Sequence, residues 1–179
     1  MKISKDRTFK IVISALFTAF IAVTSPLSIS TPFGVPLTLQ TFSVALCGYT
    51  LGCGQAAASV VAYILIGAVG LPVFSGFQGG VNVLFGLTGG FIIGFIGLSA
   101  LCGLGMRFKN IIIRILMGFS GIAVCHAVGV IQFAAVYKTG ITAAFLTASA
   151  PYLLKDAVSI ILAYFLSVYI NRVLKKIHR

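Results

Sequence analysis

The chain is a series of apolar segments separated by short stretches that contain proline, glycine or basic side chains. A helix needs about 20 apolar residues to cross the hydrocarbon core of a membrane, where every backbone polar group must be paired within the protein. The pattern therefore predicts an all-α integral membrane protein with six transmembrane helices. We expect them at approximately 9–29, 40–51, 56–69, 81–104, 111–137 and 151–174.

Two irregular stretches interrupt this series. Residues 28–40 contain Pro32, Gly34 and Pro36, and residues 70–80 are rich in glycine. Both are too apolar for a simple solvent loop, and irregular backbone at membrane depth is tolerated only where protein or a cavity covers it. The connection 138–149 includes an apolar stretch that predicts a further short helix.

The composition supports the membrane assignment. The chain is 59% hydrophobic and 8% charged, with a mean hydropathy of +1.13, whereas soluble domains have about 25% charged residues. We expect a single transmembrane domain over 1–179, with a basic N-terminal arm at 1–8 and a basic C-terminal tail at 172–179.

The net charge of +11 would indicate a nucleic-acid partner in a soluble protein, but its distribution indicates a membrane. Eleven of the thirteen basic residues lie in three clusters beside apolar segments, at the N-terminus, at 107–114 and at the C-terminus. Cytoplasmic loops carry such an excess of lysine and arginine. The clusters predict that both termini are cytoplasmic, with membrane lipid as surroundings and no nucleic acid as partner.

Lys155 and Asp156 stand in an otherwise apolar segment, and Asp156 is one of only two acidic residues in the chain. A charge at the centre of a membrane helix costs about 2.5–3.5 kcal/mol on insertion scales. One interpretation places the pair among the lipid headgroups, in contact with water. The other is a polar binding site inside the helix bundle.

The second interpretation gains support from the predicted topology. Both irregular stretches and the start of the last helix fall on the outer side, so their polar and aromatic side chains are expected at one end of the bundle. Small-molecule sites are mostly apolar with a few convergent polar groups. Each candidate taken alone also suits a capping or packing role. The candidate ligand-binding residues are Thr38, Gln40, Phe74, Phe77, Gln78, Asn82, Tyr152, Lys155 and Asp156, with Phe33 as a further aromatic.

Motifs for catalysis or ATP hydrolysis are absent from the sequence. It contains no glutamate and no G-x-x-x-x-G-K-[ST] phosphate-binding loop. The four cysteines are interpreted as small buried hydrophobic residues, so we expect no cofactor and no metal. His126 is open to two interpretations, a proton relay or a residue that packs between helices. The prediction is a binding and transport protein, not an enzyme.

Several stretches together resemble the BioY family, the biotin-binding membrane subunits (S components) of energy-coupling-factor (ECF) transporters. The similar stretches are VPLTLQT at 35–41, YILIGAVGLPVF at 63–74, and the pair Gly79-Gly80 followed by GLTGGF at 86–91. They occur in the family's order and spacing over nearly the whole chain.

The resemblance implies a six-helix subunit of a bacterial cytoplasmic membrane that captures biotin with high affinity from outside. Its partners would be a transmembrane coupling protein and two cytoplasmic ATPase subunits, and small residues on the first helix, here Ala15 and Ala19, would dock on the coupling protein. The family's acid near the start of the last helix falls on Asp156, where it would bind the ureido N–H groups. Many members have a lysine three residues later, where this chain has Ser159, and a glycine where this chain has Lys155.

Two alternatives stay open at this point. The changed pattern around Asp156 allows an S component for another vitamin, with the same architecture. The second alternative is a stand-alone secondary transporter, which inverted repeats and a site for a coupling ion would favour.

Overall fold

The computed structural model of the chain describes residues 5–29, 31–32 and 35–177, so the predicted aromatic Phe33 lies outside the described residues. This part of the chain folds into helices and one short hairpin. The longer helices are α1 (Lys5–Thr24), α2 (Gln40–Leu51), α3 (Cys53–Ala68), α5 (Gly89–Gly105), α6 (Ile111–Tyr137) and α8 (Leu153–Ile177). The shorter elements are β1 (Ser28–Ile29), β2 (Leu37–Thr38), η1 (Ser75–Phe77), α4 (Val81–Leu84), α7 (Ile141–Ala148) and η2 (Ala150–Tyr152).

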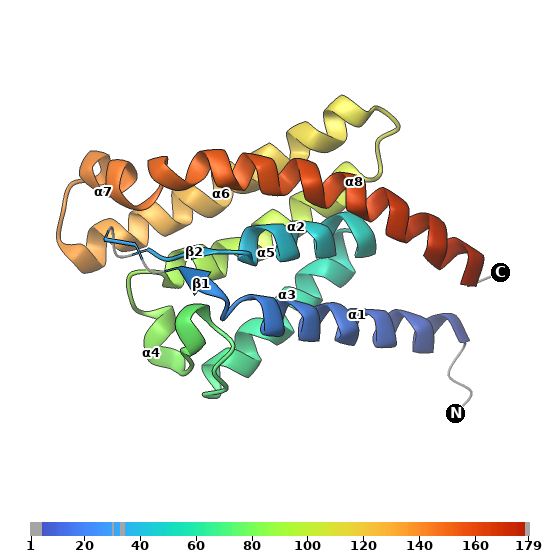
Figure 1. Cartoon of the computed structure of the whole chain (residues 1–179), viewed down its shortest axis with the longest axis horizontal. Helices are drawn as coiled ribbons and strands as arrows, with labels where there is room; N and C mark the ends of the chain where they lie inside the picture. Colours follow the sequence, from blue (N-terminus) through green and yellow to red (C-terminus); the bar gives the residue numbers. More distant parts are fainter. Residues whose placement is uncertain (1–4, 30, 33–34, 178–179) are drawn as a thin grey trace.

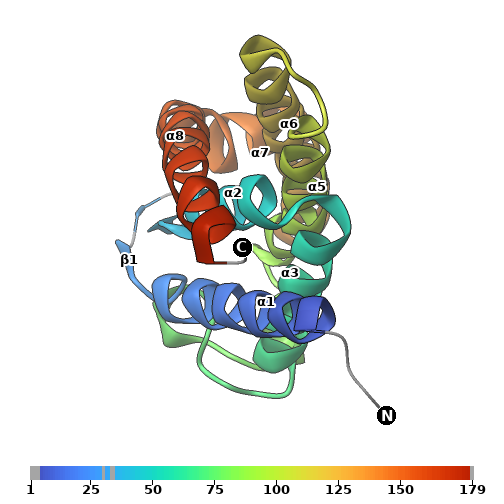
Figure 2. The same cartoon turned by 90° about the vertical axis from the view of Figure 1, so that its right-hand side faces the viewer.

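The helices form one bundle with two distinct ends (Figure 1). The start of α1, the α2–α3 turn, the α5–α6 connection and the end of α8 lie at one end, which we call the basic end. The β1–β2 hairpin, the 70–80 segment and α7 lie at the other, which we call the loop end. Viewed along the bundle, α2 occupies the centre (Figure 2), where it contacts α1, α3, α5 and α8. Its apolar side chains are buried on nearly all sides, as expected for a helix without a polar face.

Three segments of the described chain are long and apolar enough to cross a membrane, namely Arg7–Thr24, Ile111–Tyr137 and the α7–α8 segment Ile141–Leu174. Two shorter apolar helices, Cys53–Ala68 and Gly89–Gly105, accompany them. The chain is thus a helical membrane protein. The predicted short helix in the 138–149 connection is confirmed as α7.

Two predicted helix boundaries were wrong. The first helix ends at Thr24 instead of continuing to residue 29, because Pro26 disfavours helical backbone at the residue before it. The predicted fourth helix over 81–104 is broken into α4 and α5. At this break the Gln132 side chain donates to the carbonyls of Leu84 (2.7 Å) and Gly86 (2.8 Å). These two hydrogen bonds replace backbone hydrogen bonds that a continuous helix would have made.

Glycines allow α5 and α6 to pack closely. A Cβ built on Gly94 would lie 2.7 Å from the Cα of Cys125, and one on Gly90 would lie 2.6 Å from the carbonyl oxygen of Val128. Membrane helices associate through such small residues, which let two backbones approach. The close contact holds the α6 side chains near residue 126 in a fixed position against α5.

Candidate binding site

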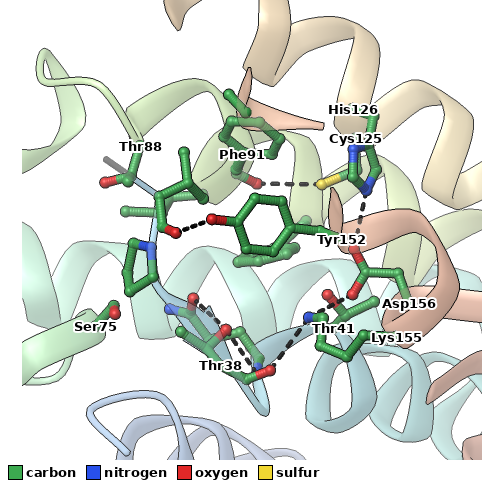
Figure 3. A pocket seen from close by; sticks show the side chains of 16 residues that line it. Thr38, Thr41, Ser75, Thr88, Phe91, Cys125, His126, Tyr152, Lys155 and Asp156 are labelled. Atoms are coloured by element: carbon green, nitrogen blue, oxygen red, sulfur yellow. Dashed lines mark hydrogen bonds and ion pairs between the residues drawn. The ribbon is translucent and has the colours of Figure 1, made fainter. Parts of the chain in front are cut away.

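A narrow cavity of about 50 Å³ lies at the loop end, between β2, α2, α5, α6 and the start of α8 (Figure 3). Its polar side chains gather along the α2 and α8 side, and aromatic and aliphatic side chains from α5 form the opposite wall. The lining consists of Val35, Pro36, Thr38, Gln40, Thr41, Ser75, Thr88, Phe91, Ile92, Phe95, Cys125, His126, Ala148, Tyr152, Lys155 and Asp156.

Asp156 is the centre of the polar wall. It is only 4% exposed, and its two carboxylate oxygens have different partners. Lys155 Nζ lies 2.5 Å from Oδ1, and His126 Nε2 lies 2.9 Å from Oδ2. A buried carboxylate is tolerated when it is paired and hydrogen-bonded in this way. Since a carboxylate has about four acceptor positions, Asp156 retains capacity for further N–H donors.

His126 connects Asp156 to α7. Its Nδ1 lies 2.7 Å from Ser149 Oγ, at the C-terminal end of α7, while Nε2 faces Asp156. A neutral imidazole with its proton on Nε2 satisfies both contacts, because Nε2–H then donates to the carboxylate and Nδ1 accepts from the serine hydroxyl. The Phe91 ring packs edge-on against the imidazole, with ring centroids 5.6 Å apart. His126 is therefore held by contacts on three sides.

The side chain of Lys155 curves back toward the acid that follows it. Adjacent helix residues point about 100° apart, yet the long lysine chain lets Nζ contact both Asp156 and the carbonyl oxygen of Thr38, at 3.2 Å. Ser159 instead donates to the carbonyl oxygen of Lys155, at 2.9 Å, and does not line the cavity. The positive group of this site thus comes from the residue before the acid.

A second polar chain links the two irregular stretches. Thr38 Oγ1 donates to Gln40 Oε1 (3.1 Å), and Gln40 Nε2 donates to the hydroxyl of Tyr63 (3.0 Å). Tyr63 in turn donates to the carbonyl of Val73, at 3.3 Å. Because side chains alternate along a strand, Thr38 points inward while Leu37 is exposed. Hydrogen bonds through Gln40 and Tyr63 therefore connect the hairpin to the 70–80 segment, and Gln40 itself lines the cavity.

Tyr152 lines the cavity and contacts the segment between β1 and β2. Its hydroxyl donates to the carbonyl of Val35 and lies 2.7 Å from Thr31 Oγ1, which itself donates to the Val35 carbonyl. Tyr152 belongs to η2, just before α8, so these contacts connect the start of α8 to the β1–β2 hairpin. They form a latch of three residues, Thr31, Val35 and Tyr152.

We expect Tyr152→Phe to loosen this latch, because the ring stays while the hydroxyl is lost. The dissociation rate of bound ligand should increase about two- to tenfold, as for the loss of one hydrogen bond worth about 0.5–1.5 kcal/mol. Stopped-flow displacement of a fluorescent ligand analogue would measure it. Tyr169→Phe is the matched control, because Tyr169 is exposed and far along α8. Equal dissociation rates for both variants would contradict the latch.

The structure brings five of the nine predicted ligand-binding residues together and leaves four apart. Thr38, Gln40, Tyr152, Lys155 and Asp156 line the cavity. The other four do not line it: Phe74 is buried against Gly67 and Tyr63, whereas Phe77, Gln78 and Asn82 are exposed on the 70–80 segment and α4.

Sequence reasoning missed several residues of the cavity. His126 was open to two interpretations, and the aromatic wall of Phe91 and Phe95 was not predicted. Ser149, which does not line the cavity but contacts His126, was not predicted either. A signal for His126 existed, since an ionisable residue inside a membrane helix is by default a functional candidate with a nearby partner. Asp156 is the acidic residue that serves as the partner of His126.

Ala15 and Ala19, the predicted docking residues, are exposed on α1. The opposite side of this helix packs on α3, where Thr18 Oγ1 donates to the carbonyl of Ser59 (3.1 Å) and Ser59 Oγ donates to that of Ser14 (3.2 Å). The face that carries the two alanines is therefore exposed in the described part of the chain.

A bundle of apolar helices that encloses a polar, partly aromatic cavity defines a membrane-embedded binding protein. Its fold is that of a solved structure described as the S-component for biotin from an ECF-type ABC transporter, with a TM-score of 0.82, 22% identity, and coverage of 98% of this chain and 95% of that chain.

The chain belongs to the BioY family, whose model matches residues 1–176. It is 41% identical over 119 residues to the biotin transporter BioY of Thermotoga maritima, covering 65% of this chain and 69% of that protein. It is 38% identical over 144 residues to a probable biotin transporter BioY of Pyrococcus horikoshii, covering 80% of this chain and 85% of that protein. The predicted resemblance is thus confirmed.

Proposed function

We propose that this chain binds biotin and acts as the substrate-binding subunit of an importer whose ATPases are separate chains. The observation that carries this proposal is the buried Asp156, held between Lys155 and His126 and facing an aromatic wall. Membership in the BioY family supports the ligand, and the S-component fold supports the type of transporter.

The chemistry of the cavity suits the ureido group of biotin. This group is neutral, with two N–H donors on either side of a carbonyl acceptor. Asp156 supplies acceptor oxygens for N–H groups, and the ammonium group of Lys155 supplies donors for a carbonyl. Phe91, Ile92 and Phe95 supply apolar surface for the sulfur-containing ring. Lys155 also balances the charge of Asp156, so the pair suits a ligand head without net charge.

Binding requires the cavity to widen. Its volume of about 50 Å³ has room for only a few water molecules, at about 10–15 Å³ each. We propose that the segments 35–40 and 70–80 move outward to admit ligand and then close over it. We propose that this movement brings Phe74, Phe77, Gln78 and Asn82 to the ligand.

Calorimetric titration of the purified chain in detergent tests the ligand. We expect tight binding of biotin, and none of thiamine or riboflavin. Binding of another vitamin in place of biotin would support the alternative that the changed residues around Asp156 left open. A folded chain that binds none of them would overturn the assignment.

The topology we propose has six membrane crossings, with both termini in the cytoplasm of a bacterium and the loop end facing outward. Its support is the placement of the basic clusters, since positively charged segments remain on the cytoplasmic side. The partners are a transmembrane coupling protein, two cytoplasmic ATPase subunits and membrane lipid, with no nucleic acid. Biotin uptake by cells that lack the ATPases would instead favour a stand-alone secondary transporter.

We propose that Ala15 and Ala19 dock on the coupling protein. Because small residues let helices approach closely, Ala19→Leu should reduce copurification of the coupling protein and the ATPases at least several-fold. Biotin binding should remain unchanged, since Ala19 is exposed and does not line the cavity. Leu16→Met, a change on the same helix that adds no bulk, is the control. Normal complex formation by Ala19→Leu would exclude this face as the docking surface.

A further inference from the structure

Two adjoining cavities at the basic end belong to neither the binding site nor the α1 docking face. The larger, of about 500 Å³, lies between the α2–α3 turn, the end of α5, the start of α6 and the end of α8. The smaller, of about 230 Å³, lies between α1, the end of α2 and the end of α8. They share the lining residues Thr50, Leu51 and Asn171.

The larger cavity is positively charged. Arg114 from α6 and Arg172 from α8 line it together with Tyr49 and Asn171, and no acidic residue is among the lining residues whose side chains the structure describes. Arg114 uses two of its donors within the protein, Nε to the carbonyl of Phe108 (2.7 Å) and Nη1 to the hydroxyl of Tyr164 (3.3 Å). A guanidinium group has five N–H donors, so three remain for a ligand. Arg172 is exposed and has no partner among the residues whose side chains are described.

The smaller cavity is mostly apolar. Phe9, Ile13, Leu51 and Leu174 line it, with Lys10 and Gln55 at its polar side. Between the two cavities, the Oγ1 of Thr50 is buried and has no hydrogen-bond partner in the described part of the chain. Buried hydroxyls are normally paired. A ligand that fills both cavities would therefore need a polar, anionic end beside Arg114 and Arg172 and an apolar end beside Phe9 and Leu174.

We propose that these cavities bind an anionic phospholipid. Its phosphate would lie between Arg114 and Arg172, and the part of one acyl chain nearest the headgroup would lie in the smaller cavity. Arginine suits this role because its planar group donates two parallel hydrogen bonds to a phosphate. Basic pockets between membrane helices are known binding places for anionic lipid headgroups. The adjacent apolar cavity favours a lipid over a free phosphate ion, which would use only the larger cavity.

Native mass spectrometry of the detergent-purified chain tests this proposal. With phosphatidylglycerol and phosphatidylcholine added in equal amounts, the chain should retain phosphatidylglycerol preferentially. Arg172→Gln should lower this retention about tenfold, since a hydrogen bond to a charged group contributes about 1.5–3 kcal/mol. Because Arg172 is exposed, the variant should fold normally. Lys109→Gln is the matched control, an exposed basic residue near the same end that lines neither cavity.

Three outcomes would overturn the proposal. The first is equal retention of the two lipids by the unmodified chain. The second is equal loss of phosphatidylglycerol in Arg172→Gln and Lys109→Gln, which would indicate a diffuse surface effect. The third is complete displacement of the lipid by millimolar inorganic phosphate, which would indicate a site for a small anion. A thermal-unfolding scan with each lipid checks the result independently, because a lipid bound to the folded chain raises its unfolding temperature.

Discussion

Asp156→Asn should abolish biotin binding while the chain stays folded. The asparagine side chain has nearly the same shape but replaces one acceptor oxygen with a donor NH₂ group. His126 Nε2 and Lys155 Nζ, which contact the two carboxylate oxygens, are both donors in this network, and so are the ureido N–H groups. Only one acceptor oxygen would remain for all of them. Truncating a buried, hydrogen-bonded charge at a binding interface costs about 2–5 kcal/mol of binding free energy, so affinity should fall at least about 30-fold.

Calorimetry of the purified variant beside the unmodified chain would measure this loss. Ser159→Ala is the matched control. Ser159 lies on the same helix and is buried, but its hydroxyl donates to the Lys155 carbonyl, and the residue does not line the cavity. We expect its affinity for biotin to remain within about twofold, since a back-bonded helix serine contributes little. An Asp156→Asn variant that elutes as a folded monodisperse protein and binds biotin normally would exclude this carboxylate as the ligand contact.

The sequence predicted the helical architecture well because membrane helices are specified by long apolar runs. The breaks at Pro26 and at 85–88, between α4 and α5, were harder to place, because an apolar run does not show where a helix stops inside it. The break before α5 is stabilised by the side chain of Gln132, more than forty residues away in the sequence. Such a contact cannot be found from local pattern alone.

Candidate polar residues were predicted best where the sequence constrains their direction. Thr38 and Gln40 lie at a strand end and a helix start, and Lys155 and Asp156 at the start of α8. By contrast, the 70–80 segment turns through positive φ angles at Gly76 (68°), Phe77 (59°) and Gly80 (98°). These angles decide which side chains face inward, and residue type alone does not fix them. Phe74 therefore packs against α3, while Phe77 points outward.

The contact between His126 and Asp156 could not be predicted from the sequence pattern. His126 lies thirty residues before Asp156, on a different helix, and the close α5–α6 packing through Gly90 and Gly94 sets its position. Three residues after Asp156, where the family resemblance led us to expect a lysine, this chain has Ser159. The contact between His126 and Asp156 suggests how the site functions with that change: we propose that His126 positions the carboxylate for the ligand.

Two substitutions at position 126 test this positioning role, because each preserves one of the two contacts of the imidazole. The amide nitrogen of glutamine reaches approximately as far as Nε2, and that of asparagine approximately as far as Nδ1. His126→Gln should keep the donor to Asp156, whereas His126→Asn should keep only a contact with Ser149. We expect biotin affinity to fall no more than about threefold for glutamine and about 10- to 100-fold for asparagine. The larger loss corresponds to a hydrogen bond to a charged group, about 1.5–3 kcal/mol.

Calorimetry again provides the measurement, and Ser149→Ala separates the two contacts of His126. If the histidine acts by positioning Asp156, Ser149→Ala should weaken binding only slightly, because the Nε2 contact survives. If the histidine served only to pack α6 against α7, Ser149→Ala and His126→Gln would instead lower the unfolding temperature together and leave affinity unchanged. A purely structural role also predicts equal affinities for the glutamine and asparagine variants. The order of affinities, with glutamine above asparagine, is therefore the result that a positioning role requires and a packing role does not produce.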